Sequence, residues 1–109
     1  MLASLLGSLN KERVLIYLAA RGRGYARQIA RFFDAPLFPL QNALDKLESA
    51  GVLISRSVGS TREYEFNPRY AARAEIASLV NRALSLYPQK IQNQLLLVRA
   101  RPRRKGKPL

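Results

Sequence analysis

The stretch that decides the fold is residues 25–51, YARQIARFFDAPLFPLQNALDKLESAG. Its second half carries apolar residues three and four positions apart, namely Leu40, Ala43, Leu44 and Leu47. This spacing gathers them on one face of an α-helix. Gly51 follows, and glycine most readily adopts the left-handed conformation just beyond a helix end. We therefore expect a helix over residues 26–33, a tight turn at residues 34–36 and a second helix that ends at Gly51.

Two prolines, Pro36 and Pro39, set the start of the second helix. Proline disfavours helical geometry in the residue before it. We expect the regular helix to begin near Pro39, because a proline fits the first helical position, where its missing N–H costs no intrahelical bond. A start at Pro36, with Pro39 still in the first turn, is the alternative. Two helices joined by a short turn form a helix-turn-helix unit, whose second helix commonly enters the DNA major groove.

A further helix is expected before this unit, over residues 9–20. It follows Ser8, whose hydroxyl can accept a hydrogen bond from the first turn. Residues 1–7 form a short apolar lead-in, and residues 22–24, with two glycines, are expected to form a loop.

A β-hairpin is expected after the unit. Residues 52–56 are rich in strand-forming side chains, and residues 62–66 alternate between polar and apolar. Residues 58–61 read as the turn between them, and Pro68 closes the hairpin because proline cannot extend a ladder. The fold class that we predict is mainly α with a small β-hairpin.

A longer helix is expected over residues 70–87, where Pro88 ends it. Its apolar face is more typical of a core or a subunit interface than of a ligand site. We expect a homodimer, with the helix at residues 9–20 or the lead-in as the other half of the interface. The predicted dimerisation residues are Ile76, Leu79, Val80, Ala83, Leu84 and Tyr87.

The charge points to a polyanionic partner. The net charge is +12, and residues 99–109 contain six basic side chains and no acid, so the rest of the chain carries +12 − 6 = +6. Phosphate backbone is the first candidate. We divide the chain into a domain of residues 1–87, a short apolar helix at residues 88–98 and a basic tail at residues 99–109 that should be disordered by itself.

Several classes of function are disfavoured. The chain has no cysteine and no histidine, which excludes disulfides, thiolate or imidazole metal sites and Cys/His catalysis. We find no paired acids, phosphate-binding loop or nucleophile–base pair, and we expect neither an enzyme nor a cofactor. The apolar start is too short for a secretory signal, and no apolar run approaches the ~20 residues of a membrane span. We expect a cytoplasmic, nucleoid-associated protein without a membrane partner.

The order of elements resembles the winged helix-turn-helix transcriptional regulators, particularly the ArsR-like and MarR-like families. The stretches that carry the resemblance are LLGS (residues 5–8), YARQIA (25–30), LDKLESAGVL (44–53) and GSTREYEFNP (59–68). It covers residues 5–87 and implies a winged helix with a C-terminal dimerisation helix that binds double-stranded DNA, as a dimeric repressor or autoregulator. The chain departs from the pattern at residues 36–39, where such regulators usually have small polar residues. Metal sensing is not implied, because the cysteine and histidine ligands are missing.

The face of the second helix opposite its apolar residues holds the candidates for reading bases: Phe38, Gln41, Asn42, Asp45 and Lys46. An amide can pair with the adenine edge, a carboxylate can accept from cytosine, a lysine can take guanine or phosphate, and a phenyl ring can pack on a thymine methyl. The competing interpretation is a solvated surface or one that binds protein.

Basic side chains elsewhere are candidates for phosphate or groove contacts: Arg27, Arg31, Arg56, Arg62, Arg101, Arg103, Arg104 and Lys105. The first two share one face of a helix, and the next two flank the hairpin turn. The alternatives are a solvated helix face, a surface pair between Arg62 and Glu63 or Glu65, and a nonspecific charged tail.

A second hypothesis for the whole chain is a winged-helix protein-interaction module with nonspecific nucleic-acid affinity. Its protein partner would bind at Leu37 and Phe38 or on the apolar segment from Ile91 to Val98. An exposed phenylalanine suits a protein partner as well as DNA.

Overall fold

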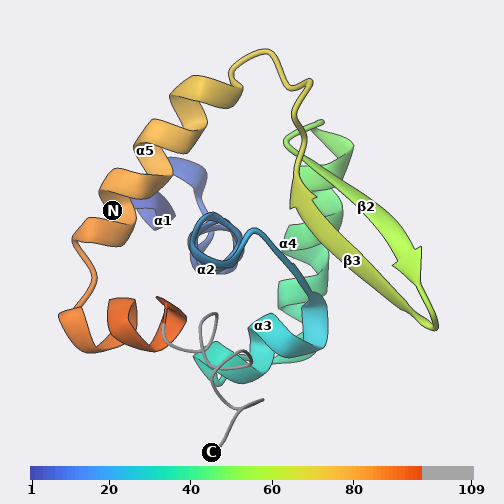
Figure 1. The fold of residues 1–109 in the computed structure, drawn as a ribbon, viewed down its shortest axis with the longest axis horizontal. Helices are drawn as coiled ribbons and strands as arrows, with labels where there is room; N and C mark the ends of the chain where they lie inside the picture. The colour runs from blue at the N-terminus through green and yellow to red at the C-terminus, as the bar shows by residue number, and fades with distance from the viewer. Residues whose placement is uncertain (97–109) are drawn as a thin grey trace, which may run out of the picture.

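The computed structural model describes residues 1–96, so the predictions for Val98 and for the basic tail lie outside the described residues. Six helical segments and a three-stranded sheet make up this part. In chain order they are α1 (Leu2–Leu6), α2 (Leu9–Arg21), β1 (Arg23–Tyr25), α3 (Ala26–Phe33), α4 (Leu37–Ser49), β2 (Leu53–Val58), β3 (Thr61–Phe66), α5 (Arg73–Ser85) and a final helix at residues 89–96. Helices α3 and α4 form the helix-turn-helix unit, and β2 and β3 form the wing that follows it (Figure 1). The predicted mainly helical winged-helix fold is confirmed.

Helix α2 forms the centre of the core. Residues 14–18 are all buried, with at most 1% of any of them exposed. The helix begins where Ser8 accepts a hydrogen bond from the backbone N–H of Lys11 over 3.1 Å, as its position in the sequence predicts. Figure 1 looks along α2 and shows α5, α3, α4 and the sheet arranged around it.

Helix α4 begins earlier than we expected. Its first residue is Leu37 and Pro36 is the N-cap, so the expected start near Pro39 is wrong and the alternative is the closer one. Pro39 fits in the first turn because the first backbone N–H groups of a helix have no intrahelical partner. The end is as predicted: Gly51 has φ 85°, and the N–H of Val52 donates to Leu47 over 3.0 Å.

The sheet has one strand more than the sequence predicted. Strand β1 pairs antiparallel with β3, so residues 23–25 are not the expected loop, and the strand order is β1-β3-β2. A Cβ on Gly24 would lie 2.8 Å from Cε1 of Tyr17, so only glycine lets this strand pass so close to α2. The expected hairpin is present, with register from Leu53 opposite Phe66 to Val58 opposite Thr61, but its strands are longer than predicted, so Val58 and Thr61 belong to the strands and not to the turn.

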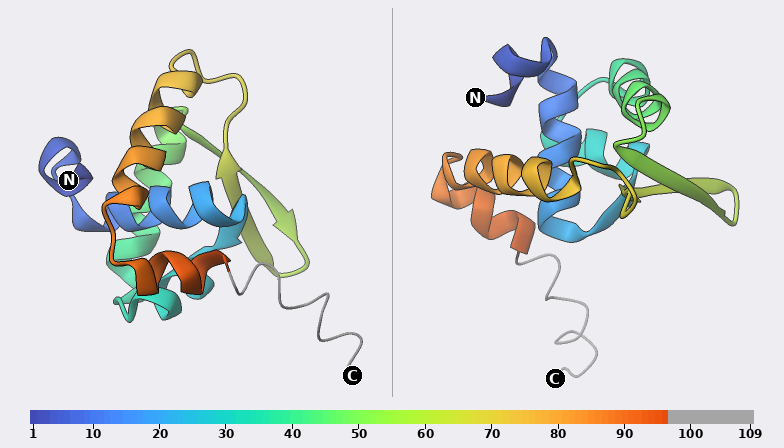
Figure 2. Two further views of the ribbon diagram at one scale, coloured as in Figure 1. Left: turned by 60° about the vertical axis from the view of Figure 1, so that its left-hand side comes forward. Right: turned by 90° about the horizontal axis from the view of Figure 1, so that it is seen from above.

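The wing stands apart from the helices. Residues 56–62 are all exposed, and the right-hand view of Figure 2 shows the hairpin projecting from the helical body. Helix α1 lies on the opposite side of the molecule from the wing (Figures 1 and 2). None of the helices within residues 1–96 is both long and apolar enough to cross a membrane.

Helix α5 is shorter than the predicted helix at residues 70–87, since it runs only from Arg73 to Ser85. Two of its predicted dimerisation residues, Val80 and Ala83, are buried in the core of the single chain, with 0% and 1% exposure. The other apolar residues of that face pack against the core and are partly buried: Ile76, Leu79, Leu84 and Tyr87. The predicted dimerisation face of α5 therefore packs within the core of the single chain.

The last helix packs onto the same core. Leu95 is fully buried, so the apolar segment that begins at Ile91 finds its partner surface within the chain. Arg21 contacts this helix by donating from Nε to the carbonyl of Leu95 over 3.0 Å, while its guanidinium lies over the rings of Tyr17 and Phe32.

Candidate nucleic-acid interface

The outward face of α4 offers three unoccupied side chains. Phe38, Asn42 and Lys46 are spaced four residues apart, so they share one side of the helix. All three are exposed, and Phe38 is 83% exposed. Neither Asn42 nor Lys46 makes a side-chain hydrogen bond or ion pair to any residue in 1–96. This face can therefore offer an amide, a cation and an apolar ring to a partner.

Two of the other base-reading candidates are already bonded within the protein. The amide nitrogen of Gln41 donates to Oδ1 of Asp45 over 3.1 Å and to the hydroxyl of Tyr64 over 3.0 Å. Both amide hydrogens of Gln41 are thereby used. Gln41 and Asp45 keep their place as predicted contacts. The N–H groups of Gln41 would have to exchange these bonds before they could donate to a base, whereas the exposed carboxylate of Asp45 has further acceptor sites.

Helix α3 presents two free cations. Arg27 and Arg31 lie four residues apart, and both are exposed. Within the described part of the chain neither has an acidic partner. Their positive charges are therefore not neutralised by the protein.

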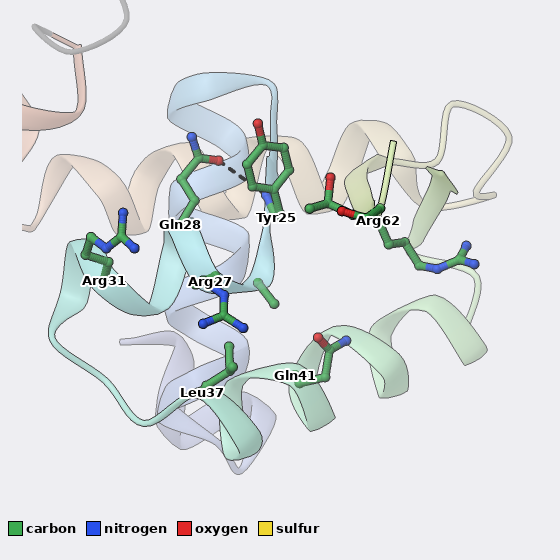
Figure 3. A pocket seen from close by; sticks show the side chains of 10 residues that line it. Tyr25, Arg27, Gln28, Arg31, Leu37, Gln41 and Arg62 are labelled. Carbon is green, nitrogen blue, oxygen red and sulfur yellow. Dashed lines mark hydrogen bonds between the residues drawn. The ribbon is translucent and has the colours of Figure 1, made fainter. Parts of the chain in front are cut away.

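A groove of about 430 Å³ opens between α3, the start of α4 and the tip of the wing. Its lining includes Tyr25, Arg27, Gln28, Arg31, Gln41 and Arg62. In Figure 3 Arg27 points into the space between α3 and α4, whereas the guanidinium of Arg62 extends away from the groove. On α4 the groove is lined by Leu37 and Gln41, on the wing by residues 60–62, and its lining carries no acidic side chain.

The two arginines of the wing differ in their surroundings. Arg56 lies directly opposite Glu63 and pairs with it over 3.2 Å, and Arg23 lies 3.9 Å from the same carboxylate. Arg62 does not form the pair with Glu63 or Glu65 that we considered; it donates to Oγ of Ser55 over 3.0 Å. The strand alternation places Arg56 and Arg62 on opposite faces of the hairpin. Only Arg62 lies on the face toward α4.

One buried hydroxyl joins helix α4 to the sheet. Tyr64 lies on β3 with 2% of its surface exposed, and burial raises the pKa of its phenol. Tyr64 therefore stays protonated at neutral pH, and its oxygen accepts the hydrogen bond from Gln41. The sequence placed Tyr64 in a strand but gave no sign of this bond, because it depends on how the wing lies against α4.

Exposed apolar side chains gather at the other end of the molecule. Leu5 and Leu9 are 67% and 49% exposed, and Leu86, just beyond α5, is 59% exposed. The neighbouring Tyr87 donates its hydroxyl to Glu12, which is buried and also accepts from the backbone N–H of Ala3 over 2.7 Å. These bonds tie the end of α5 to α1 and α2. Leu5, Leu9 and Leu86 are not among the dimerisation residues predicted from the sequence.

The remaining candidates lie beyond residue 96: Arg101, Arg103, Arg104 and Lys105. Among the described residues no cluster of three or more His, Cys, Asp or Glu side chains could hold a metal ion.

Comparison with known proteins identifies the fold. No protein-family model matches the chain, and no curated protein matches it. One solved structure that matches is that of Lactococcus lactis ZitR, in the apo form of a mutant in which a cysteine and a histidine are replaced by alanine. The TM-score is 0.53 at 18% identity, and the match covers 79% of this chain and 67% of that one. At this identity the likeness shows a shared winged-helix fold.

Proposed function

We propose that this protein is a sequence-specific transcriptional regulator of the ArsR-like or MarR-like type that binds double-stranded DNA as a homodimer and acts as a repressor or autoregulator. The observation that carries the proposal is the outward face of α4. Phe38, Asn42 and Lys46 stand free on the second helix of a helix-turn-helix unit, beside two arginines without acidic partners.

DNA would meet this surface in three places. The outward face of α4 lies in the major groove, where Asn42 can pair with adenine and Phe38 can contact a thymine methyl. The wing reaches the adjacent backbone or minor groove with Arg62. The strand between them passes along the groove lined by Arg27 and Arg31, which neutralise its phosphates.

The basic tail adds affinity without adding a base contact. Its candidate residues, Arg101, Arg103, Arg104 and Lys105, belong to a group of six basic side chains in residues 99–109. Each phosphate that they neutralise releases counterions, so the tail contributes a log–log salt slope of roughly −5 at most.

Dimerisation would double these contacts. The wing lies away from α1 (Figure 2), and the bonds of Glu12 to Tyr87 and Ala3 hold α1 beside the end of α5. Leu5 on α1 and Leu9 at the start of α2 are exposed. A two-fold interface there leaves both copies of α4 free to face DNA. Dimers of this kind place their recognition helices about 34 Å apart, one turn of the double helix. The bound site is then a pseudo-palindrome.

Selection of bound sequences from random duplex DNA at physiological salt tests the proposal. We expect an enriched pseudo-palindromic motif with half-sites one helical turn apart. Salt-sensitive binding without a motif would contradict sequence-specific regulation, because electrostatic contacts alone carry no sequence information.

A second function has one observation in its favour. Phe38 is 83% exposed on the corner that also carries Leu37, which suits a protein-interaction module with nonspecific nucleic-acid affinity. The same selection separates the two functions. If Phe38 serves protein recognition alone, replacing it with alanine leaves every DNA affinity unchanged.

A further inference from the structure

Two hydrogen-bonded bridges connect α4 to the wing. The first runs from Gln41 on α4 to the hydroxyl of Tyr64 on β3 over 3.0 Å. Asp45, one helical turn along, accepts the second amide hydrogen of Gln41 over 3.1 Å and so holds the amide in this orientation. The ring of Tyr64 is buried in the core, which makes the β3 end of this bridge immobile.

The second bridge uses the other end of α4. The hydroxyl of Ser55 on β2 donates to Oε2 of Glu48 over 2.6 Å. The same oxygen of Ser55 accepts from Nη1 of Arg62 over 3.0 Å. A hydrogen bond to a carboxylate is stronger than one between neutral groups. Ser55 thus connects the carboxylate of Glu48 on α4 to the guanidinium of Arg62 on the wing.

The bridges hold α4 at two separate points. Gln41 and Glu48 are seven residues apart, about 10 Å along a helix. Their partners Tyr64 and Ser55 lie directly opposite each other in the sheet register, so both bridges converge on one cross-strand pair. The apolar face of α4 is packed in the core, and two bonds at this spacing restrict the direction of the helix relative to the sheet further than a single bond would.

Little else in the described chain orients the outer half of the hairpin. Residues 56–62 are all exposed, so no buried side chain beyond Ser55 anchors it to the body. The pair between Arg56 and Glu63 lies within the hairpin and cannot set its angle to α4. Exposed pairs of this kind also contribute little.

We propose that Gln41, Tyr64, Ser55 and Glu48 form a two-point clamp that sets the angle between the recognition helix and the wing. This inference rests on the proposed function. The four side chains are positioning residues: they hold α4 and the wing in the arrangement that reaches the major groove and its neighbouring backbone together. The clamp also explains why a helix proposed to approach phosphate carries Asp45 and Glu48. Their carboxylates accept hydrogen bonds from Gln41 and Ser55 within the protein.

The angle can be measured without DNA. The chain has no cysteine, so Ser49→Cys on α4 and Ser60→Cys at the wing tip give two unique sites for spin labels. Pulsed electron–electron double resonance, with the labelled chain diluted in excess unlabelled protein so that distances within one chain dominate, then reports the distribution of distances between them. In the background of Tyr64→Phe with Ser55→Ala, which removes one hydroxyl from each bridge, we expect a broader or shifted distribution. Tyr17→Phe is the matched control, because it removes the hydroxyl of another buried tyrosine, on α2, whose partner is Arg21 and which takes no part in either bridge. An unchanged distribution in the clamp variant would overturn the proposal.

Footprinting on the selected duplex, at saturating protein, connects the clamp to binding. For the unlabelled clamp variant we expect guanine N7 protection in the major groove to persist, loss of hydroxyl-radical protection at the wing, and affinity lower by roughly tenfold. Ser55→Thr keeps the hydroxyl and, with Tyr64 intact, should retain both the major-groove and the wing protection, whereas Ser55→Ala alone should weaken the wing protection. If the major-groove protection and the wing protection both persist, or both disappear, in the clamp variant, the result would contradict a positioning role. Absence of any protection by the wild-type protein would instead reject the proposed function, while the spin-label result would still decide the clamp.

Discussion

At position 42 the chain places an amide on the outward side of α4, without a hydrogen bond to any residue in 1–96. Gln41, one residue earlier, has the same functional group but both of its amide hydrogens are bonded. The sequence could not separate the two, because helical spacing places both on the same broad polar face. Only the contact with Tyr64 distinguishes the free amide from the bonded one.

Asn42→Ala should reduce sequence discrimination. A bidentate amide–adenine contact contributes about 1–3 kcal/mol of discrimination. The difference in binding free energy between the selected and the scrambled duplex should therefore fall by about 1–3 kcal/mol. Fluorescence anisotropy titrations with both duplexes measure this difference. Asn81→Ala, which replaces an exposed asparagine on α5, is the matched control. Equal losses on the two duplexes would reassign Asn42 to a nonspecific contact.

Phe38 should respond to a single methyl group in the DNA. Replacing thymine with deoxyuridine removes the 5-methyl group and leaves base pairing intact. For the wild-type protein, substitution at the contacted thymine should weaken binding by about 0.8 kcal/mol, the value of one buried methylene or methyl group. Phe38→Ala should bind the thymine and deoxyuridine duplexes equally well. If the wild-type protein shows no sensitivity at any thymine of the selected site, Phe38 does not read DNA in this way.

Most element boundaries followed from local chemistry. Ser8 and Gly51 mark helix ends in the sequence because capping depends on a few neighbouring residues. Strand β1 could not be predicted in this way, because three residues are too few to show a period and its pairing partner lies forty residues away in the chain. The start of α4 at Leu37 shows that a proline in a first turn does not delay a helix.

The wing separates two arginines that look alike in the sequence. Arg62→Ala should weaken binding to every duplex and reduce the salt slope by about 1, as expected for the loss of one phosphate contact. Arg56→Ala is the control, since Arg56 lies on the other face of the hairpin and is paired with Glu63. Neither change should lower the melting temperature appreciably, because both side chains are exposed. A larger loss of affinity for Arg56→Ala than for Arg62→Ala would place DNA on the opposite face of the wing.

For the molecule as a whole, the sequence identified apolar surface correctly but could not divide it between core and interface. The apolar residues of α5 recur with a helical period whether they pack in the core of one chain or against a second chain. In the structure Val80 and Ala83 are buried within the chain, and large apolar side chains remain exposed at Leu5, Leu9 and Leu86. Which face stays uncovered depends on how α2 and α5 pack, and this information is not local.

The dimer is therefore tested best at the exposed positions. Leu5→Asp combined with Leu86→Asp should yield monomers in sedimentation velocity, with circular dichroism unchanged, because neither side chain belongs to the core. Val58→Asp is a matched control, since Val58 is 45% exposed but lies on the wing. A dimer that survives the double change at wild-type affinity would place the interface on another surface.

If the outward face of α4 reads base sequence in duplex DNA, the wild-type protein must distinguish the selected duplex from a scrambled duplex of equal length and composition. A competition titration between the two duplexes at about 0.15 M salt measures this. We expect the selected duplex to bind at least about 10³-fold more tightly, the lower end of the range for specific DNA-binding proteins. Equal affinity for the two duplexes would contradict it.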